Sequence, residues 1–198
     1  MKLCVDPRAK ALIFDLDGTL ANSMPLHYKA WIKTAERNKF PFSKEILIET
    51  TGASTYTIVG ILNERFGLGL DQDEITRQKE YAFYDMIDQM PANKVVVDLV
   101  HEYYGKLPMA TGTGAIRDLA ERQLAALGID KKLPILVSSD DVENHKPAPD
   151  TFLQCAELLN IAPKDCQVFE DSAYGIQAAE AAGMMATDVT PYLKPWNV

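Results

Sequence analysis

The sequence predicts an α/β protein: a parallel sheet flanked by helices, with a small, purely helical module inserted after the first strand. Two observations support this prediction. Short apolar runs alternate with helical patterns along most of the chain, and such alternation is typical of parallel sheets that carry helices on both faces. Between the first apolar run and the later ones, residues 21–92 show helical patterns only, which indicates an insertion.

Five short apolar runs are expected to form the strands. Each run is too short for a helix, and the first four are followed by glycine, serine or acidic residues, as strands of a buried sheet often are. The predicted strands cover residues 11–14, 107–111, 134–137, 167–170 and, as a possible fifth, 184–187.

Helices are expected between the later strands, where three apolar stripes repeat every 3.6 residues. The stripes begin at Ile116, Phe152 and Ile176, and glycines end the first and the third of them, at Gly128 and Gly183.

The inserted module is expected to contain four helices. They cover 25–37, a short piece after Ser43, 55–66 and 73–90, and Asp71 with Glu74 resembles a capping box before the last of them. The joints would lie near 19–23 and 90–94, which gives a core of residues 1–20 and 93–198 and a helical cap of residues 21–92.

The composition is that of an ordinary globular protein and argues against nucleic acid as a partner. Of 198 residues, 47% are hydrophobic and 24% are charged, which is close to the average. The 28 acidic and 20 basic residues give a net charge of −8, whereas nucleic-acid binding usually needs a basic face. We expect a monomer or a weak oligomer.

The cysteines and the first apolar run indicate a cytoplasmic protein without a membrane partner. The first run stops at Asp15 and is too short for an export signal or a membrane span. The cysteines form no C-x-x-C pair, which favours reduced thiols, and they are Cys4, Cys155 and Cys166.

Two carboxylates, Asp15 and Asp17, follow the first predicted strand directly in the tract DLDGT. Ligands of open α/β sheets bind beyond the carboxyl ends of the strands. Two carboxylates so close together repel each other unless they share a cation, so the pair predicts a hard divalent ion, Mg²⁺. One aspartate can then act as a nucleophile and the other as a proton donor and acceptor. The alternative is an acidic turn that caps a helix.

Three further strand ends carry polar groups. The hydroxyl of Thr111 and the amide of Gly112 suit a phosphate oxygen at a helix N-terminus. Lys146 precedes a proline, which holds it in an extended conformation where its ammonium could neutralise a phosphate and the aspartate pair. Glu170 and Asp171 form a second acid pair. Each feature alone also fits a turn, a solvated lysine or a helix cap, but the ordered set is far more specific.

This order of acid pair, hydroxyl, lysine and acid pair closely resembles the haloacid-dehalogenase superfamily of phosphotransferases, over essentially the whole chain. The resemblance implies a Rossmann-like core and a small helical cap that closes over the site and selects the substrate. It also implies that Asp15 attacks phosphorus to give an aspartyl-phosphate. Asp17 would protonate the leaving alcohol and then activate water.

The resemblance implies roles for the remaining site residues as well. Thr111 and Lys146 would hold the phosphoryl oxygens, with Gly112 beside them. Mg²⁺ would bind Asp15, the backbone carbonyl of Asp17 and Asp171, with Glu170 as a ligand or behind one.

Within the superfamily, the β-phosphoglucomutase-like branch is the most similar. The similarity rests on four tracts: His27-x-x-Ala30-Trp31, Gly52-Ala-Ser54, Lys79 and His145-Lys-Pro-Ala-Pro-Asp150. It makes His27 a candidate for substrate binding or proton relay, and Lys79 a candidate for sugar binding. A helix histidine and a solvated lysine are the alternatives.

Two departures from the mutases argue for hydrolysis. Mutases carry an arginine after Gly-x-Ser, where this chain has Thr55, and a Lys-Asn pair where it has Gly114-Ala115. A mutase must hold a bisphosphate intermediate, and these groups grip its second phosphate. Other tracts resemble bacterial phosphatases of fructose-1-phosphate and 6-phosphogluconate, namely Met109–Thr113, Phe169–Ser172 and Gly175–Ala179.

The predicted function is therefore Mg²⁺-dependent hydrolysis of a small sugar phosphate. Three alternatives remain. A β-phosphoglucomutase would need the missing arginine. A haloacid dehalogenase uses the same first aspartate but needs neither a metal nor a second acid, so Asp17 counts against it. A non-catalytic binding module would not need five residues of catalytic type.

Overall fold

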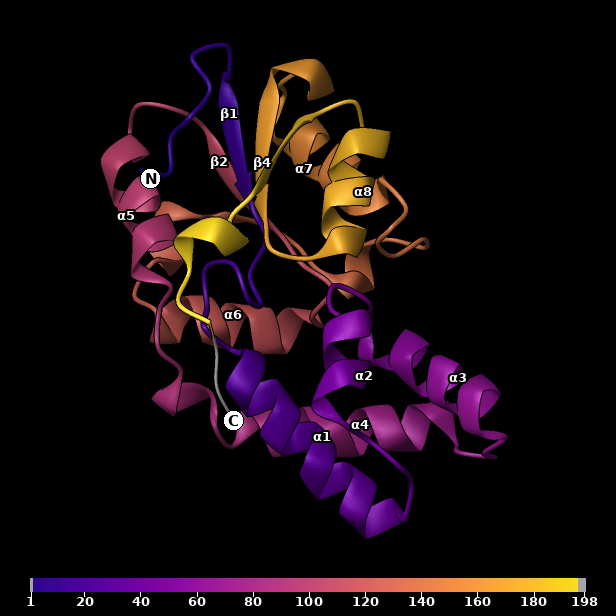
Figure 1. Ribbon diagram of the computed structural model, residues 1–198. Helices are drawn as coiled ribbons and strands as arrows, with labels where there is room; N and C mark the ends of the chain where they lie inside the picture. The colour runs from indigo at the N-terminus through magenta and orange to yellow at the C-terminus, as the bar shows by residue number, and fades with distance from the viewer. Residues whose placement is uncertain (1, 196–198) are drawn as a thin grey trace.

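The protein folds into a parallel five-stranded sheet with helices on both faces and a group of helices beyond the carboxyl ends of the strands (Figure 1). The structure, a computed structural model, describes residues 2–195. The strands lie in the order β3-β2-β1-β4-β5, and every neighbouring pair is parallel. Their bounds are β1 Ala11–Phe14, β2 Met109–Gly112, β3 Ile135–Val137, β4 Cys166–Glu170 and β5 Met185–Asp188.

The predicted α/β fold with its parallel sheet is confirmed, and all five predicted strands are present. Three of them begin later than expected, β2 by two residues and β3 and β5 by one. The prediction placed residues 107 and 134 at the starts of strands, but β2 begins after Pro108 and β3 begins after Pro134. Proline lacks the N–H that a strand in a sheet donates, so Pro108 and Pro134 lie outside the hydrogen-bond ladder of the sheet.

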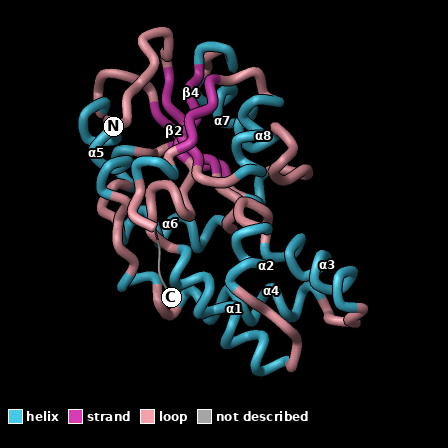
Figure 2. The backbone as a smooth tube through the Cα atoms, in the orientation of Figure 1, coloured by secondary structure: helices cyan, strands magenta, loops and turns pink. Residues whose placement is uncertain are grey.

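Four helices cover the two faces of the sheet (Figure 2). Alternate residues of β1 point to opposite faces: Leu12 and Phe14 pack with helices α5 and α6, while Ala11 and Ile13 pack with α7 and α8. Helix α5 was not among the predicted elements. The core helices are α5 Lys94–Tyr103, α6 Arg117–Ala126, α7 Asp150–Leu159 and α8 Ala173–Ala181.

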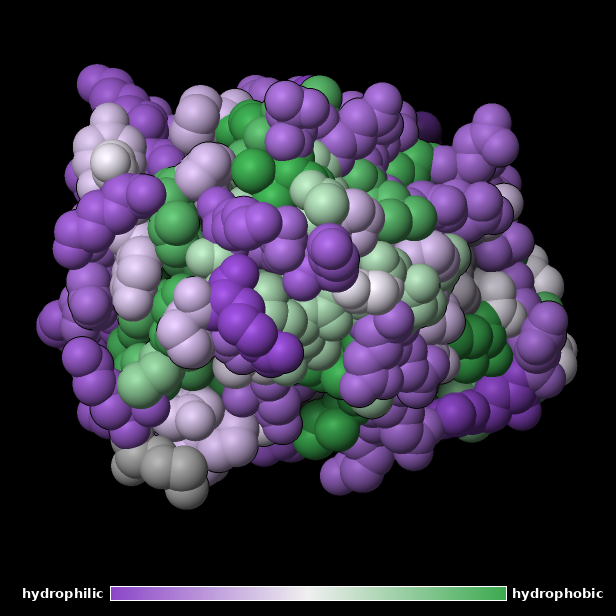
Figure 3. Space-filling view, turned by 90° about the horizontal axis from the view of Figure 1, so that it is seen from above, coloured by the Kyte–Doolittle hydropathy of each residue, from purple (hydrophilic) through white to green (hydrophobic). Residues whose placement is uncertain are grey.

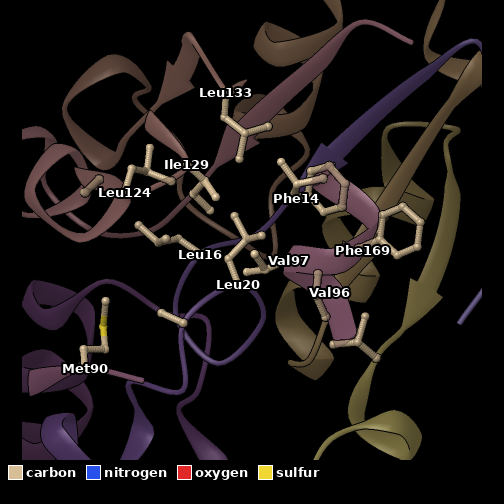
Figure 4. Packing of buried hydrophobic residues seen from close by; sticks show 14 of the residues in the cluster. Phe14, Leu16, Leu20, Met90, Val96, Val97, Leu124, Ile129, Leu133 and Phe169 are labelled. Carbon is tan, nitrogen blue, oxygen red and sulfur yellow. The ribbon is translucent and has the colours of Figure 1, made fainter. Parts of the chain in front are cut away.

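Large apolar side chains fill the face of the sheet that α5 and α6 cover (Figure 4). Phe14 of β1 and Phe169 of β4 stack with their ring centroids 5.1 Å apart. Val96 and Val97 of α5 pack in the same cluster, as does Leu16, the residue between the two aspartates of the DLDGT tract. This packing fixes the chain on either side of Leu16, and so fixes where Asp15 and Asp17 emerge.

The remaining helices lie together beyond the carboxyl ends of the strands (Figure 1). Some of their buried residues form a separate cluster around Trp31, Val59 and Leu62, while others, such as Ala30 and Phe83, pack in the large core cluster. All four predicted helices are present, and their bounds are α1 Met24–Asn38, α2 Lys44–Glu49, α3 Thr55–Phe66 and α4 Gln72–Tyr84.

The last of these helices is shorter than predicted. Helix α4 ends at Tyr84 instead of residue 90, and a 3₁₀ turn, Ile87–Gln89, follows it. The turn directs Ile87 and Met90 back into the large core cluster, where both are buried. At the start of α4, Asp71 accepts a hydrogen bond from the Glu74 backbone at 3.0 Å, as a helix cap does.

The end of the molecule opposite these helices has a mixed surface. Hydrophilic side chains separate smaller hydrophobic groups on the face seen from above (Figure 3), as is common on the exposed surface of globular proteins. None of the helices within residues 2–195 combines the length and the apolar character that crossing a membrane requires.

Candidate active site

Asp15 and Asp17 lie at the carboxyl end of the central strand. The Asp15 backbone N–H donates to the carbonyl of Phe169 at 3.0 Å, which continues the pairing of β1 with β4 by one residue. Asp15 is 5% exposed. Both aspartates line a cavity between the sheet and helices α1, α3 and α4.

Lys146 joins the ends of three strands. Its ammonium donates to Asp15 Oδ1 at 2.6 Å, to Glu170 Oε2 at 2.8 Å and to the carbonyl of Gly112 at 3.2 Å. Burial alone would lower the pKa of Lys146, but the two carboxylates raise it above its ordinary value. The lysine therefore stays charged in a buried position, where it can neutralise an anion.

Asp15, Glu170 and Asp171 form a compact acidic cluster whose carboxylate oxygens lie within 4.8 Å of one another. Backbone amides of residues 171 and 172 bond Glu170 Oε1 at 2.9 and 2.8 Å. Thr19 Oγ1 donates to Asp171 Oδ1 at 2.7 Å. These bonds fix the orientation of the carboxylates, so the cluster is held in place before any ligand arrives.

The acidic cluster fits a hard divalent cation. Burial, together with the Glu170 charge, raises the pKa of Asp15 to about 8, and the same two causes raise the pKa of Asp171 well above its usual range. Two buried carboxylates and a half-buried one, with a single lysine, are thus short of positive charge, and carboxylate oxygens are the ligands that Mg²⁺ prefers. Gly18 leaves room for this arrangement: it has a φ of +86°, and a Cβ there would lie 2.1 Å from Asp171 Oδ2.

Thr111, the last residue but one of β2, has an unused hydroxyl. The residue is fully buried, and its Oγ1 has no hydrogen-bond partner within the described part of the chain. Leaving a buried polar group unpaired costs about 1–3 kcal/mol, so a hydroxyl in this position is suited to bonding a ligand. Gly112 follows it, packed against Thr151 and Cys155 of α7.

A hydrogen-bonded chain connects Asp17 with the helical group. His27 Nε2 lies 2.7 Å from Asp17 Oδ1, and Lys79 Nζ lies 3.0 Å from His27 Nδ1. Because an ammonium only donates, Nδ1 accepts and the ring proton sits on Nε2, directed at Asp17. Burial would raise the pKa of Asp17, but His27 and Lys79 lower it to about 2. His27 also stacks on Phe83, with ring centroids 3.9 Å apart.

The structure thus places every residue of the predicted site at one end of the sheet or on the helices that face it. Two groups form: Asp15, Glu170 and Asp171 with Lys146, and Asp17 with His27 and Lys79. The Asp17 carboxylate lies with the second group. The roles assigned to these residues remain predictions.

Three polar residues of the site were missed by the sequence analysis. Thr19 orients Asp171, Gln123 Nε2 lies 3.4 Å from Asp17 Oδ2, and Glu80 bonds to Lys79 at 3.2 Å. The sequence does contain an indication of Gln123, because this polar residue falls on the apolar stripe of a predicted helix. In the structure it is fully buried. The sequence contains no indication of Glu80, since a charged residue beside Lys79 on a helix is ordinary.

Comparisons with known proteins agree with this arrangement. The model of the family "Haloacid dehalogenase-like hydrolase" matches residues 12–189. The fructose-1-phosphate phosphatase YqaB of Escherichia coli (strain K12) is 40% identical over 182 residues, which cover 92% of this chain and 97% of that protein. The β-phosphoglucomutase of Bacillus subtilis (strain 168) is 28% identical over 193 residues, which cover 91% and 83% of the two chains.

A solved structure supports the same conclusion. The crystal structure of a hydrolase from Pseudomonas syringae superposes with a TM-score of 0.83 at 25% identity, covering 90% of this chain and 84% of that one. The predicted resemblance and the predicted class of enzyme, a phosphoric monoester hydrolase, are confirmed. The chain belongs to the haloacid dehalogenase-like hydrolase family.

Proposed function

We propose that the protein is a cytoplasmic, Mg²⁺-dependent phosphatase of small sugar phosphates, of the fructose-1-phosphate or 6-phosphogluconate type. The observation that carries this proposal is the position of Lys146 between Asp15 and Glu170, beside the unpartnered hydroxyl of Thr111. Together these groups offer a nucleophile, a fixed cation and a free donor at one point. The net charge of −8 supports a phosphate site built locally rather than a basic surface for nucleic acid.

In the proposed reaction, a carboxylate oxygen of Asp15 attacks phosphorus and the bond from phosphorus to the sugar oxygen breaks. In the state that reacts, Asp17 has taken up a proton, and it gives that proton to the sugar oxygen, so the sugar leaves as an alcohol. Asp17 then takes a proton from water, whose oxygen attacks the phosphorus of the aspartyl-phosphate. Inorganic phosphate leaves and the Asp15 carboxylate is restored.

The remaining residues bind the phosphoryl group and orient the acid and base. The Thr111 hydroxyl, the Gly112 amide and the Lys146 ammonium would hold the phosphoryl oxygens, where positioned donors stabilise developing charge. His27 and Lys79 would orient Asp17. When bound to Asp15, Asp171, the Asp17 carbonyl and, directly or through another group, Glu170, Mg²⁺ would supply further neutralisation of the phosphoryl charge.

We also propose the division into a core, residues 1–20 and 93–198, and a cap, residues 21–92. The two connections lie side by side: Asn22 N donates to Pro91 O at 2.8 Å and Asn93 N to Leu20 O at 2.9 Å. The cap has its own buried cluster and meets the core again at Gly52, where a Cβ would lie 2.3 Å from Ser172 Oγ. The cap also contacts the core through the Asp17–His27 hydrogen bond and through Ile87 and Met90, which pack in the large core cluster. The adjacent connections suit a cap that opens as a rigid body about them and releases these contacts.

Ligand binding is expected to favour the closed position of the cap. With Mg²⁺ and AlF₄⁻, a mimic of the phosphoryl group, the closed position should be favoured, because closure excludes bulk water and strengthens the charge contacts at Asp15 and Lys146. Small-angle scattering should then show a smaller radius of gyration than the free protein has. Equal radii in the two states would contradict closure.

Hydrolysis should dominate over isomerisation. Thr55 donates its hydroxyl hydrogen bond to Glu80, and Gly114 has no side chain with which to bond a second phosphate. Because a bond to a charged group contributes about 1.5–3 kcal/mol, losing such grips should favour hydrolysis by at least about tenfold. We expect β-glucose-1-phosphate with a bisphosphate primer to yield mainly inorganic phosphate. Glucose-6-phosphate formed faster than phosphate, measured with a coupled dehydrogenase, would show a mutase.

A further inference from the structure

We propose that Glu80 makes the substrate cavity selective for phosphate esters whose remaining part is an uncharged polyol, and that it disfavours esters carrying a second anionic group. This inference rests on the proposed phosphatase function and narrows its substrate class. It distinguishes the two types of substrate named above, since 6-phosphogluconate carries a carboxylate and fructose-1-phosphate does not.

Glu80 stands on the cap wall of the cavity that holds Asp15 and Asp17. It follows Lys79 on α4, and its side chain is 14% exposed. One oxygen, Oε1, accepts hydrogen bonds from Thr55 Oγ1 and, at 3.2 Å, from Lys79 Nζ. Both bonds use Oε1, and no hydrogen bond to Oε2 occurs within residues 2–195, so Oε2 can accept one from a ligand. A carboxylate with a free oxygen bonds well to the hydroxyl groups of a sugar, which donate to it.

The basic groups of this cavity are already committed to protein partners. Two basic residues, His27 and Lys79, occur among the described residues that line it. The three N–H groups of the Lys79 ammonium match three acceptors: His27 Nδ1 at 3.0 Å, Thr55 Oγ1 at 3.3 Å and Glu80 Oε1 at 3.2 Å. His27 uses its other nitrogen on Asp17.

A second anionic group on the substrate would therefore lie beside the Glu80 carboxylate, and no free cation would be available to pair with that anionic group. Lys146 is held on the core side by Asp15 and Glu170, and it serves the transferred phosphoryl group. Like charges brought together in a partly buried site are strongly unfavourable. A neutral hydroxyl in the same place would instead donate to Glu80.

The test compares two open-chain substrates that differ at one carbon. Glucitol-6-phosphate ends in a CH₂OH group where 6-phosphogluconate has a carboxylate. We expect the wild-type kcat/KM to favour glucitol-6-phosphate by at least about tenfold, and Glu80→Gln to reduce this ratio by a similar factor. Because both substrates share the reacting phosphate, any effect of the variant on the chemical step cancels in the ratio.

Two further variants separate charge from structure. Glu74→Gln removes the same charge from the same helix, but Glu74 lies outside the cavity and pairs with Arg77, so the ratio should stay at the wild-type value. Glu80→Asp keeps the charge and should preserve most of the preference. The wild-type ratio alone already tests the proposal if Glu80→Gln fails to fold.

Equal kcat/KM for the two substrates in the wild type would overturn the selectivity of Glu80. The proposal would also be overturned if the ratio of kcat/KM for the two substrates were the same in Glu80→Gln as in Glu74→Gln. In both of these outcomes hydrolysis persists, and the proposed function stands. If neither substrate nor a generic aryl phosphate is hydrolysed in a manner that depends on Asp15, the proposed function fails and this inference fails with it.

Discussion

Replacing Asp15 by asparagine is expected to lower kcat by at least about 10⁴-fold, a typical effect of removing a nucleophile. Asparagine has nearly the same shape, so the bond from Lys146 and the pairing of β1 with β4 can persist. Its amide cannot form the aspartyl-phosphate, however, and the acidic cluster of Asp15, Glu170 and Asp171 loses one charge. Release of inorganic phosphate from an aryl phosphate measures the effect.

A matched variant serves as a control for activity that comes from a contaminating phosphatase. Asp98→Asn makes the same chemical change at an exposed position of α5, where Asp98 pairs with Lys94, and should retain full activity when purified in the same way. Circular dichroism should show the same fold for both variants. Turnover by Asp15→Asn at a rate close to that of Asp98→Asn would refute the nucleophile assignment.

Removing divalent cations with EDTA should abolish hydrolysis, and Mg²⁺ should restore it, because the carboxylates of Asp15, Glu170 and Asp171 lie together and repel one another without a cation. Binding should also stabilise the fold. At a Mg²⁺ concentration of about 100 times Kd, linkage gives about 2.7 kcal/mol, which for a protein of this size corresponds to a rise in Tm of roughly 5–10 °C. Thermal unfolding with and without Mg²⁺ measures it.

Two comparisons make the metal experiment specific. Asp171→Asn should shift the midpoint of the Mg²⁺ titration to higher concentration, whereas Asp98→Asn should not. Ca²⁺ should raise Tm but fail to support turnover, because it takes more ligands at longer distances and would misplace Asp15. Full activity in EDTA would favour chemistry of the dehalogenase type instead.

The sheet could be predicted because each strand is a short apolar run. Polar residues, which are unfavourable in an apolar core, follow the run and mark its end. The site followed from the same property: Asp15, Thr111 and Glu170 lie at the carboxyl ends of three neighbouring strands, so parallel pairing brings them together. Helix α5 escaped prediction because its run of valines, Val95 to Val97, is as typical of a strand as of a helix.

Other features could not be predicted because they depend on contacts between distant segments. Glu80 acquires its place only when α4 packs beside α3 and brings it to Thr55, 25 residues away. Gln123 reaches Asp17 across 106 residues. No local pattern encodes such pairs, and a single sequence gives no other indication of them.

The adjacent entry and exit of the cap have a consequence for how such a chain can vary. Ala21 and Ala92 form an antiparallel bridge, so their Cα atoms lie about 5 Å apart, little more than the length of one peptide unit. A different segment inserted between these two alanines would leave the end of β1 and the start of α5 in the same positions. The entropy of closing such a loop grows only with the logarithm of its length. An insertion of different size or sequence can therefore replace this one without shifting the register of the sheet or the aspartates at its edge.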